Sequence, residues 1–193
     1  MKYIITFIVS ILVSNNIVIR GNDKVYEIVM DFYGWYIDAI HNLPDKEYQP
    51  YVEYNDTTKT YSLKTELYCQ NLRKHYFSEN LIQRELSNYK ECSENLQKAK
   101  KVPFEDIDDY DNIGCGFVLN YRWLNNDQEA VDGVKIEEIK NIEKDHFSVL
   151  CKYYFEDGET KKITYQNYIC YVTVIKSNGK YEIDNFEFKM DNN

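Results

Sequence analysis

Glycine is scarce in this chain, and the motifs of well-known catalytic sites are missing. Only 7 of the 193 residues are glycine, whereas 19 are tyrosine. This balance favours a sheet with ordered helices over a loop-rich scaffold, because aromatic side chains bury enough surface to offset the entropy of ordering the chain. The sequence has no nucleophile elbow, no phosphate-binding loop and no HExxH motif. It therefore predicts no cofactor and gives no direct sign of catalysis.

The chain also lacks a basic stripe. It carries 23 lysine and arginine residues against 32 aspartate and glutamate residues, a net charge of −9. Without a basic stripe a protein has nothing to displace the counterions of a nucleic acid, and it binds anionic membranes poorly. We therefore expect no nucleic-acid partner. The acidity is compatible with a basic or neutral partner, although it mainly promotes solubility.

A hydrophobic run long enough to span a bilayer is missing too. The apolar run of residues 3–13 follows Met1-Lys2 and is shorter than the roughly 20 residues that a spanning helix needs. A basic start before a short apolar run is typical of a secretory signal peptide. We expect residues 1–21 to be cleaved, between Ser14 and Asn22, with no stable membrane insertion afterwards. The mature protein is then periplasmic or extracellular; a buried N-terminal strand is the alternative.

The five cysteines form no CxxC motif, and no histidine stands at zinc-ligand spacing from any pair of them. We therefore predict no metal site. Disulfides are permitted in an oxidising compartment, but an odd count leaves at least one thiol unpaired. Cys69 with Cys92 is the first pair to test, because both lie in a predicted helical stretch. Cys151 and Cys170 lie in predicted strands and fit the pattern of small buried hydrophobic residues, and Cys115 is left open.

The length suits one domain, residues 22–193, whose first half is mainly helical. Apolar positions at three- and four-residue spacing predict a helix from Asn22 or Asp23 to about His41. Residues 48–54 and 58–63 form either a short hairpin or an irregular lead-in. Residues 65–100 are again helical with a break at Ser78, which is a suitable N-cap because its hydroxyl can accept a hydrogen bond from a free amide.

The second half predicts strands at residues 116–124, 134–142, 146–155, 161–176 and 180–188. The last three form a meander, because Asp157-Gly158 and Asn178-Gly179 supply the positive φ angles that tight hairpin turns need. The apolar parity of the last strand changes near Asp184-Asn185, which predicts a bulge. Residues 168–175 are apolar at nearly every position, as expected for a strand covered on both faces. The predicted class is α+β, with N-terminal helices packed on a strongly bent antiparallel sheet.

This order of elements resembles the cystatin-like cone of the nuclear-transport-factor-two and ketosteroid-isomerase superfamily. The closer likeness is to domain of unknown function 3828, a group of secreted bacterial proteins with that fold. Residues 181–188 and three short motifs carry the likeness: Phe32-Tyr33-Gly34-Trp35-Tyr36, Tyr76-Phe77-Ser78-Glu79-Asn80-Leu81 and Asp109-Tyr110-Asp111-Asn112-Ile113. Asn112 departs from the family, which tends to have proline there. The resemblance implies the cystatin-like cone and brings no established activity with it.

A sheet of this shape often encloses a cavity, so we expect ligand contacts on its concave face. The candidate residues are Trp35, Tyr36, Tyr165, Asp109 and Asp111. The acidic run at residues 105–111 fits the twelve-residue calcium loop in neither of two registers. The three histidines, His41, His75 and His146, are expected at the surface or at the ends of elements.

The function that we expect is a non-catalytic binding module for a small ligand or a protein partner. The alternative is a pocket enzyme of isomerase or lyase type that uses an Asp/Tyr acid–base pair, as the isomerase relatives do. A buried cavity of several hundred cubic ångströms with convergent polar groups favours a ligand or a substrate. A flat, exposed aromatic patch of more than about 600 Å² favours a protein partner.

Overall fold

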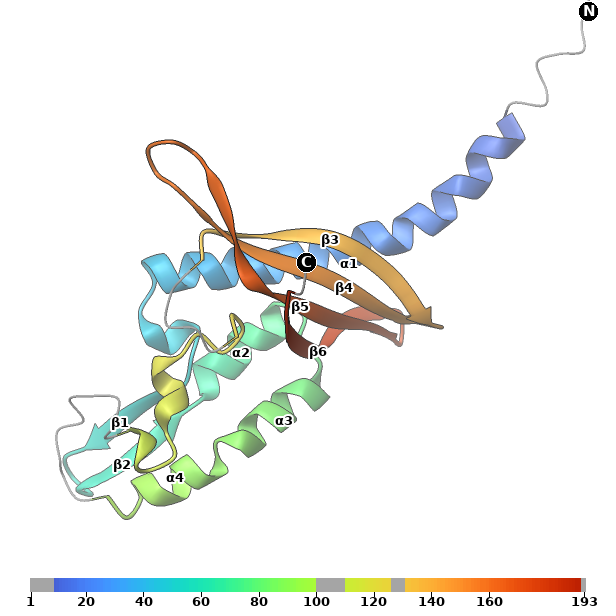
Figure 1. Ribbon diagram of the computed structural model, residues 1–193. Helices are drawn as coiled ribbons and strands as arrows, with labels where there is room; N and C mark the ends of the chain where they lie inside the picture. The colour runs from blue at the N-terminus through green and yellow to red at the C-terminus, as the bar shows by residue number, and fades with distance from the viewer. Residues whose placement is uncertain (1–8, 100–109, 126–130, 192–193) are drawn as a thin grey trace, which may run out of the picture.

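Helices and antiparallel strands make up the fold, so the α+β class is confirmed (Figure 1). The structure is a computed structural model and describes residues 9–99, 110–125 and 131–191. The elements are α1 (Val9–Asn42), η1 (Asp45–Glu47), β1 (Tyr51–Asn55), β2 (Thr60–Lys64), α2 (Glu66–Lys74), α3 (Glu79–Asn88), α4 (Lys90–Leu96), η2 (Gly116–Leu119), β3 (Gly133–Glu143), β4 (His146–Glu156), β5 (Ile163–Ser177) and β6 (Lys180–Met190). No helix in the described ranges has the length and apolar character needed to cross a membrane.

The main sheet is a four-stranded meander in the order β3-β4-β5-β6, as the turn signals predict. Asn178 and Gly179 join β5 to β6 with φ angles of 50° and 79°, the positive values that this kind of hairpin turn requires. In β4 the residues Phe147, Val149 and Cys151 alternate with less buried neighbours, so that one face of the strand points into the core.

The predicted bulge in the last strand is confirmed. Thr173 of β5 pairs with Asn185, but the next residue, Val174, pairs with Ile183, which leaves Asp184 as the extra residue on β6. The insertion lets Ile183 and Phe186 both reach the core although their positions differ in parity.

The core lies between the inner face of this sheet and α1. The buried residues of α1 recur at helical spacing and include Val25, Ile28, Val29, Phe32 and Tyr36. Around Phe32 the rings of Phe77, Trp123 and Phe186 have their centroids within 4.8–6.4 Å of its own. Rings packed edge to face in this way stabilise a core beyond the area that they bury.

A second, smaller hydrophobic core stabilises the disulfide lobe, which we define as β1, β2, α4 and η2. Its buried residues are Tyr61, Cys92, Leu96 and Cys115, and Cys92 is bonded to Cys115. The prediction that Cys69 pairs with Cys92 is therefore wrong. Cys69 is a buried free thiol in the main core, so the two side chains do not share a core. Of the two alternatives for residues 48–63, the structure has the short hairpin, formed by β1 and β2.

Three other expectations need correction. Helix α1 begins at Val9 rather than near Asn22, because no proline stops it upstream of that point. Residues 116–124 form η2 and turns, not a strand; Gly114, with φ of 71°, turns the chain just before them. Strand β5 is buried on one face only, since Tyr168, Cys170, Val172 and Val174 alternate with half-buried residues.

The expected arrangement of helices and sheet is also only partly right. The helices are not confined to the N-terminal part as one block, because the β1–β2 hairpin separates α1 from α2. The sheet is not strongly curled (Figure 1). The rings of Phe32, Tyr33 and Tyr153 fill the space between α1 and the sheet, and this filling keeps the sheet from closing around a cavity.

Candidate functional site

The residues predicted to line a concave face are spread over the molecule. Tyr36 is fully buried in the core, and Trp35 lies half-buried with its ring stacked on His75. Tyr165 is 41% exposed near the start of β5, where its ring packs against that of Tyr154. Asp111 is exposed at the end of a helical segment, and Asp109 lies outside the described residues. The four described residues do not converge on one cavity.

The inner face of the sheet has polar groups, but they serve packing. The hydroxyls of Tyr33 and Tyr153 are 2.6 Å apart and buried. Burial raises the pKa of both phenols well above the ordinary value, so both stay protonated at neutral pH. The Tyr48 hydroxyl donates to Asp45 Oδ1 at 2.8 Å, and burial raises the pKa of Tyr48 as well. Neither arrangement supplies a tyrosinate for acid–base chemistry.

A groove at one end of the sheet does gather charged and aromatic side chains. It is lined by residues of α1, the end of α2 and the segment after it, and the β5–β6 turn, and has a volume of about 410 Å³. We call it the basic groove; its lining is Lys24, Ile28, Arg73, Lys74, Tyr76, Phe77, Gly179, Lys180, Tyr181 and Glu182. Four of these residues are cationic and one is acidic, in a chain whose net charge is −9.

The wall of the groove contains a tyrosine in an unusual backbone conformation. After α2, the Phe77 amide donates to the Leu72 carbonyl at 3.0 Å and the Tyr76 amide donates to Arg73 at 3.3 Å. These two bonds define a Schellman cap, in which the residue at the position of Tyr76 is usually glycine. Tyr76 has φ of 68°, a left-handed conformation that costs a residue with a side chain roughly 1–2 kcal/mol. Backbone strain of this kind gathers at functional positions.

The segment of Tyr76 to Ser78 is hydrogen-bonded to β6 beside its bulge, and these bonds hold the floor of the groove in place. The Ile183 amide donates to the Tyr76 carbonyl at 2.7 Å, and the Ser78 amide donates to the Ile183 carbonyl at 2.9 Å. The Ser78 hydroxyl donates to Asp184 Oδ1 at 2.5 Å and accepts from the Leu81 amide at 3.0 Å. Ser78 is therefore the N-cap of α3, as predicted.

Two of the groove's cations are already paired, and two are not. Lys24 Nζ lies 3.1 Å from Glu27 and 5.8 Å from the centre of the Tyr76 ring. Arg73 donates to Glu79 from Nε and Nη2, and this hydrogen bonding lowers the pKa of Glu79. Neither Lys74 nor Lys180 forms an ion pair with any residue that the structure describes. These two ammonium groups are free to meet a ligand.

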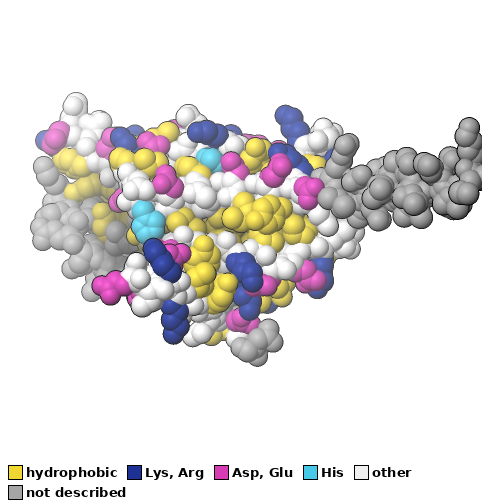
Figure 2. Space-filling model, turned by 90° about the horizontal axis from the view of Figure 1, so that it is seen from above, with side chains coloured by type: hydrophobic (Ala, Val, Ile, Leu, Met, Phe, Trp, Pro, Cys, Tyr) yellow, Lys and Arg dark blue, Asp and Glu magenta, His cyan; other side chains and the backbone are white. Residues whose placement is uncertain are grey.

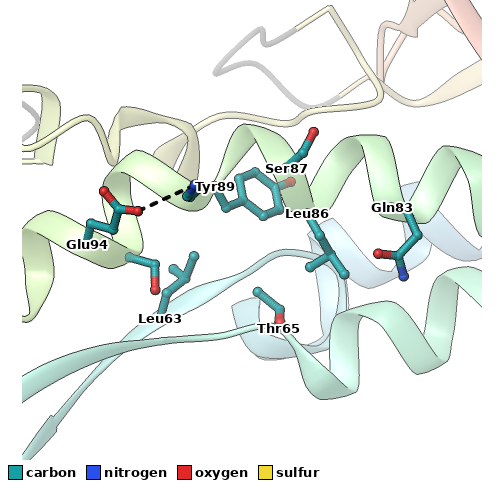
Figure 3. Close-up of a pocket in the computed structure, with 9 residues that line it drawn as sticks. Leu63, Thr65, Gln83, Leu86, Ser87, Tyr89 and Glu94 are labelled. Atoms are coloured by element: carbon teal, nitrogen blue, oxygen red, sulfur yellow. Dashed lines mark ion pairs between the residues drawn. The ribbon is translucent and has the colours of Figure 1, made fainter.

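A larger pocket, of about 450 Å³, lies between β2 and helices α3 and α4 (Figure 3). Leu63 and Thr65 point into it from one side, and Leu86 and Tyr89 from the other. In the same pocket Lys90 Nζ lies 3.8 Å from Glu94 Oε1, so the positive and the negative charge of this pocket compensate each other. No charge in this pocket is left for a ligand to neutralise, which makes it the weaker candidate.

Behind that pocket is a buried carboxylate, Glu85, which is only 2% exposed. The hydroxyl of Tyr89 donates to it, and Arg122 Nε donates to Oε1 at 3.0 Å and to Oε2 at 3.1 Å. Burial raises the pKa of Tyr89 well above its ordinary value, so the phenol remains a donor. The hydrogen bonds attach Arg122, which precedes the buried Trp123, to α3; this is a structural role.

A third depression, of about 380 Å³, runs between α1 and the start of β3. Met30, Ile37 and Val134 line it together with the carboxylates of Asp38 and Asp132. Figure 2 shows the face of the molecule that is seen from above. Hydrophobic side chains gather across the centre of this face, and charged side chains surround them.

The sequence did not reveal the basic groove or the burial of His75. Lys24, the pair Arg73-Lys74 and Lys180 lie in three separate segments, and basic residues at the end of a helix are ordinary. His75, expected at the surface or at the end of an element, is the C-cap of α2 but is only 8% exposed. Its Nδ1 lies 2.8 Å from Asp31 Oδ2, and its ring centroid lies 4.3 Å from that of Trp35. His41 is exposed and His146 lies at the start of β4, as expected.

Comparison with known proteins finds no match: no family model, no curated protein and no solved structure is similar to this chain. The resemblance to the cystatin-like family therefore stays a prediction, and the function has to be argued from the site alone.

Proposed function

We propose that this protein is an exported, non-catalytic binding protein that holds a small anionic ligand with a flat ring in the basic groove. The observation that carries the proposal is the convergence of four cations and two tyrosine rings in one groove of an acidic chain. In this proposal the fold is a filled variant of the cystatin-like cone. Cleavage between Ser14 and Asn22 leaves Val25 and the buried residues that follow it in α1 intact.

Lys74 and Lys180 supply the charge that an anionic ligand needs. Both side chains are exposed, line the groove and lack a carboxylate partner among the described residues. Hydrogen bonds from an ammonium group to an anionic oxygen are shorter and stronger than neutral ones. A phosphate or carboxylate in the groove accepts from both, whereas a neutral ligand leaves both cations without a partner.

Tyr76 and Tyr181 supply the aromatic surface for a flat ring. Lys176 Nζ lies 5.2 Å from the centre of the Tyr181 ring, and Lys24 lies over Tyr76. Both tyrosines are half-buried, so part of each ring faces the groove. A flat apolar group packs against such rings in offset or edge-to-face geometry. The strained backbone of Tyr76 is explained if the ring contacts a ligand, since glycine at that position relieves the strain but provides no ring.

The experiment is calorimetric titration with phenyl phosphate, which combines a dianion with a ring; benzyl alcohol is the neutral control. We expect the double variant Lys74→Ala/Lys180→Ala to bind phenyl phosphate at least tenfold more weakly than the wild type, since each lost charge-assisted hydrogen bond contributes about 1.5–3 kcal/mol. The matched control is Lys98→Ala, an exposed lysine after α4. Equal affinity of the double variant and the wild type, or equal binding of benzyl alcohol, contradicts the proposal.

A protein partner is the second candidate, and the depression between α1 and β3 favours it. Its apolar lining and two carboxylates suit a segment with apolar and basic residues. A peptide of alternating leucine and lysine is a direct probe, with Asp38→Asn as the variant expected to weaken it. No binding of this peptide at millimolar concentration leaves the basic groove as the one candidate.

A further inference from the structure

Cys151 and Cys170 are directly opposite each other on neighbouring strands of the main sheet. They are register partners in the β4–β5 pairing, in a stretch from His146 to Lys152 that has no bulge. Both thiols are free, and both residues are completely buried. Register partners point to the same face of the sheet, so both thiols lie on the inner face.

The backbone geometry suits a bond between them. Opposed residues of an antiparallel pair have Cα atoms roughly 4.5–5.5 Å apart, and a disulfide spans Cα atoms roughly 4.4–6.8 Å apart. The bond therefore requires side-chain rotation but no change in register. Cys69, the other free thiol, lies on α2 and is not part of this sheet.

The surroundings determine when such a bond can form. Burial raises the pKa of the Cys151 thiol well above its ordinary value and that of Cys170 to about 11. Only the thiolate attacks a disulfide, so a protonated thiol beneath α1 is inert in the folded protein. A bond between the two thiols therefore has to form while the chain folds, before α1 covers the inner face of the sheet.

We propose that Cys151 and Cys170 form a second, cross-strand disulfide when the chain folds in the presence of a small-molecule disulfide such as oxidised glutathione. One thiol loses its proton, and its thiolate attacks the oxidant to form a mixed disulfide and release one reduced thiol. The second cysteine then loses its proton and displaces the other half of the oxidant. Two electrons and two protons pass from the protein to the oxidant, which ends as two thiols.

The Cys92–Cys115 bond of the disulfide lobe is compatible with an oxidising environment, in which a further disulfide is permitted. The five cysteines are then accounted for as two disulfides and one buried thiol, Cys69. This assignment also agrees with the odd count, which requires at least one thiol to stay free.

The test is a thiol count on the whole chain. The protein is reduced and unfolded, refolded with reduced and oxidised glutathione, treated with iodoacetamide in denaturant, and digested for mass spectrometry. We expect one alkylated residue, Cys69, and a linked peptide that joins Cys151 to Cys170. Alkylation of all three cysteines, or a bond from Cys69 to either strand, overturns the proposal.

The variant Cys69→Ser supplies the matched control, because it removes the thiol that we expect to remain. Refolded in the same way, it should show no alkylated cysteine and keep the Cys151–Cys170 peptide. Two alkylated cysteines in this variant contradict the proposal. The wild-type measurement decides the question even if this variant fails to fold.

Discussion

The inner face of the main sheet and the basic groove both contain tyrosines, but they use them in opposite ways. Tyr33 and Tyr153 lie inside, with their hydroxyls paired to each other and almost no exposed surface. Tyr76 and Tyr181 lie at the end of the sheet, half-buried and beside lysines. The two regions show that the number of tyrosines alone does not distinguish a packed core from a groove lined by cations; the neighbours of each ring do.

Of the differences between the two regions, the largest change in the free energy of unfolding is expected at high pH. Burial raises the pKa of Tyr33 and of Tyr153 above the unfolded value of about 10. Below pH 10 both the folded and the unfolded state keep these protons, so stability does not depend on them. Above pH 10 the unfolded state loses them first, and the free energy of unfolding falls as pH rises toward the folded pKa values.

We therefore expect alkaline unfolding that coincides with ionisation of the buried phenols, followed by tyrosine absorbance at 295 nm and by circular dichroism. Gradual ionisation of all tyrosines near pH 10 with an intact fold contradicts the description of a closed, filled inner face.

The next largest effect compares two tyrosines of the same sheet. Tyr153→Ala removes a fully buried ring and should lower the free energy of unfolding by about 3–5 kcal/mol in urea titration. Its control is Tyr165→Ala, which removes a ring that is 41% exposed and should change stability by no more than about 0.5 kcal/mol. Similar losses in both variants would show that Tyr165 contributes to stability as much as a core residue does.

The smallest effect on stability, but the most specific one, is expected at Tyr76. Tyr76→Gly relieves the left-handed backbone and should leave the free energy of unfolding unchanged or raise it by up to about 1 kcal/mol. The same variant should lose affinity for phenyl phosphate, because the ring is gone. A large loss of stability without loss of affinity would assign Tyr76 to packing. Urea titration and calorimetry on one preparation measure both quantities.

Much of the fold could be predicted because its signals are local. The Asn178-Gly179 turn, the change in parity at Asp184 and the cap at Ser78 each involve a few neighbouring residues. In the structure two of these predicted features contact each other, because the hydroxyl of the N-cap Ser78 donates to the carboxylate of Asp184 in the bulge. Neither signal shows this contact by itself, because the two residues are 106 positions apart in the sequence.

The site could not be predicted for the same reason. Each cation of the basic groove has an ordinary local explanation, and only the fold brings Lys24, Lys74 and Lys180 together. His75 and Asp31 are 44 positions apart. Cys92 and Cys115 are 23 positions apart, and nothing in their spacing distinguishes them from other pairs of cysteines.

The most direct test of the central claim is to locate the anion on the protein. Isotope-labelled protein is titrated with phenyl phosphate, and the amide shifts are followed by nuclear magnetic resonance. Binding in the basic groove predicts that the largest shifts fall at residues 73–77 and 179–182 and are lost in Lys74→Ala/Lys180→Ala. Shifts centred on the pocket of Leu63, Leu86 and Tyr89, or no saturable shift at any residue, would contradict it.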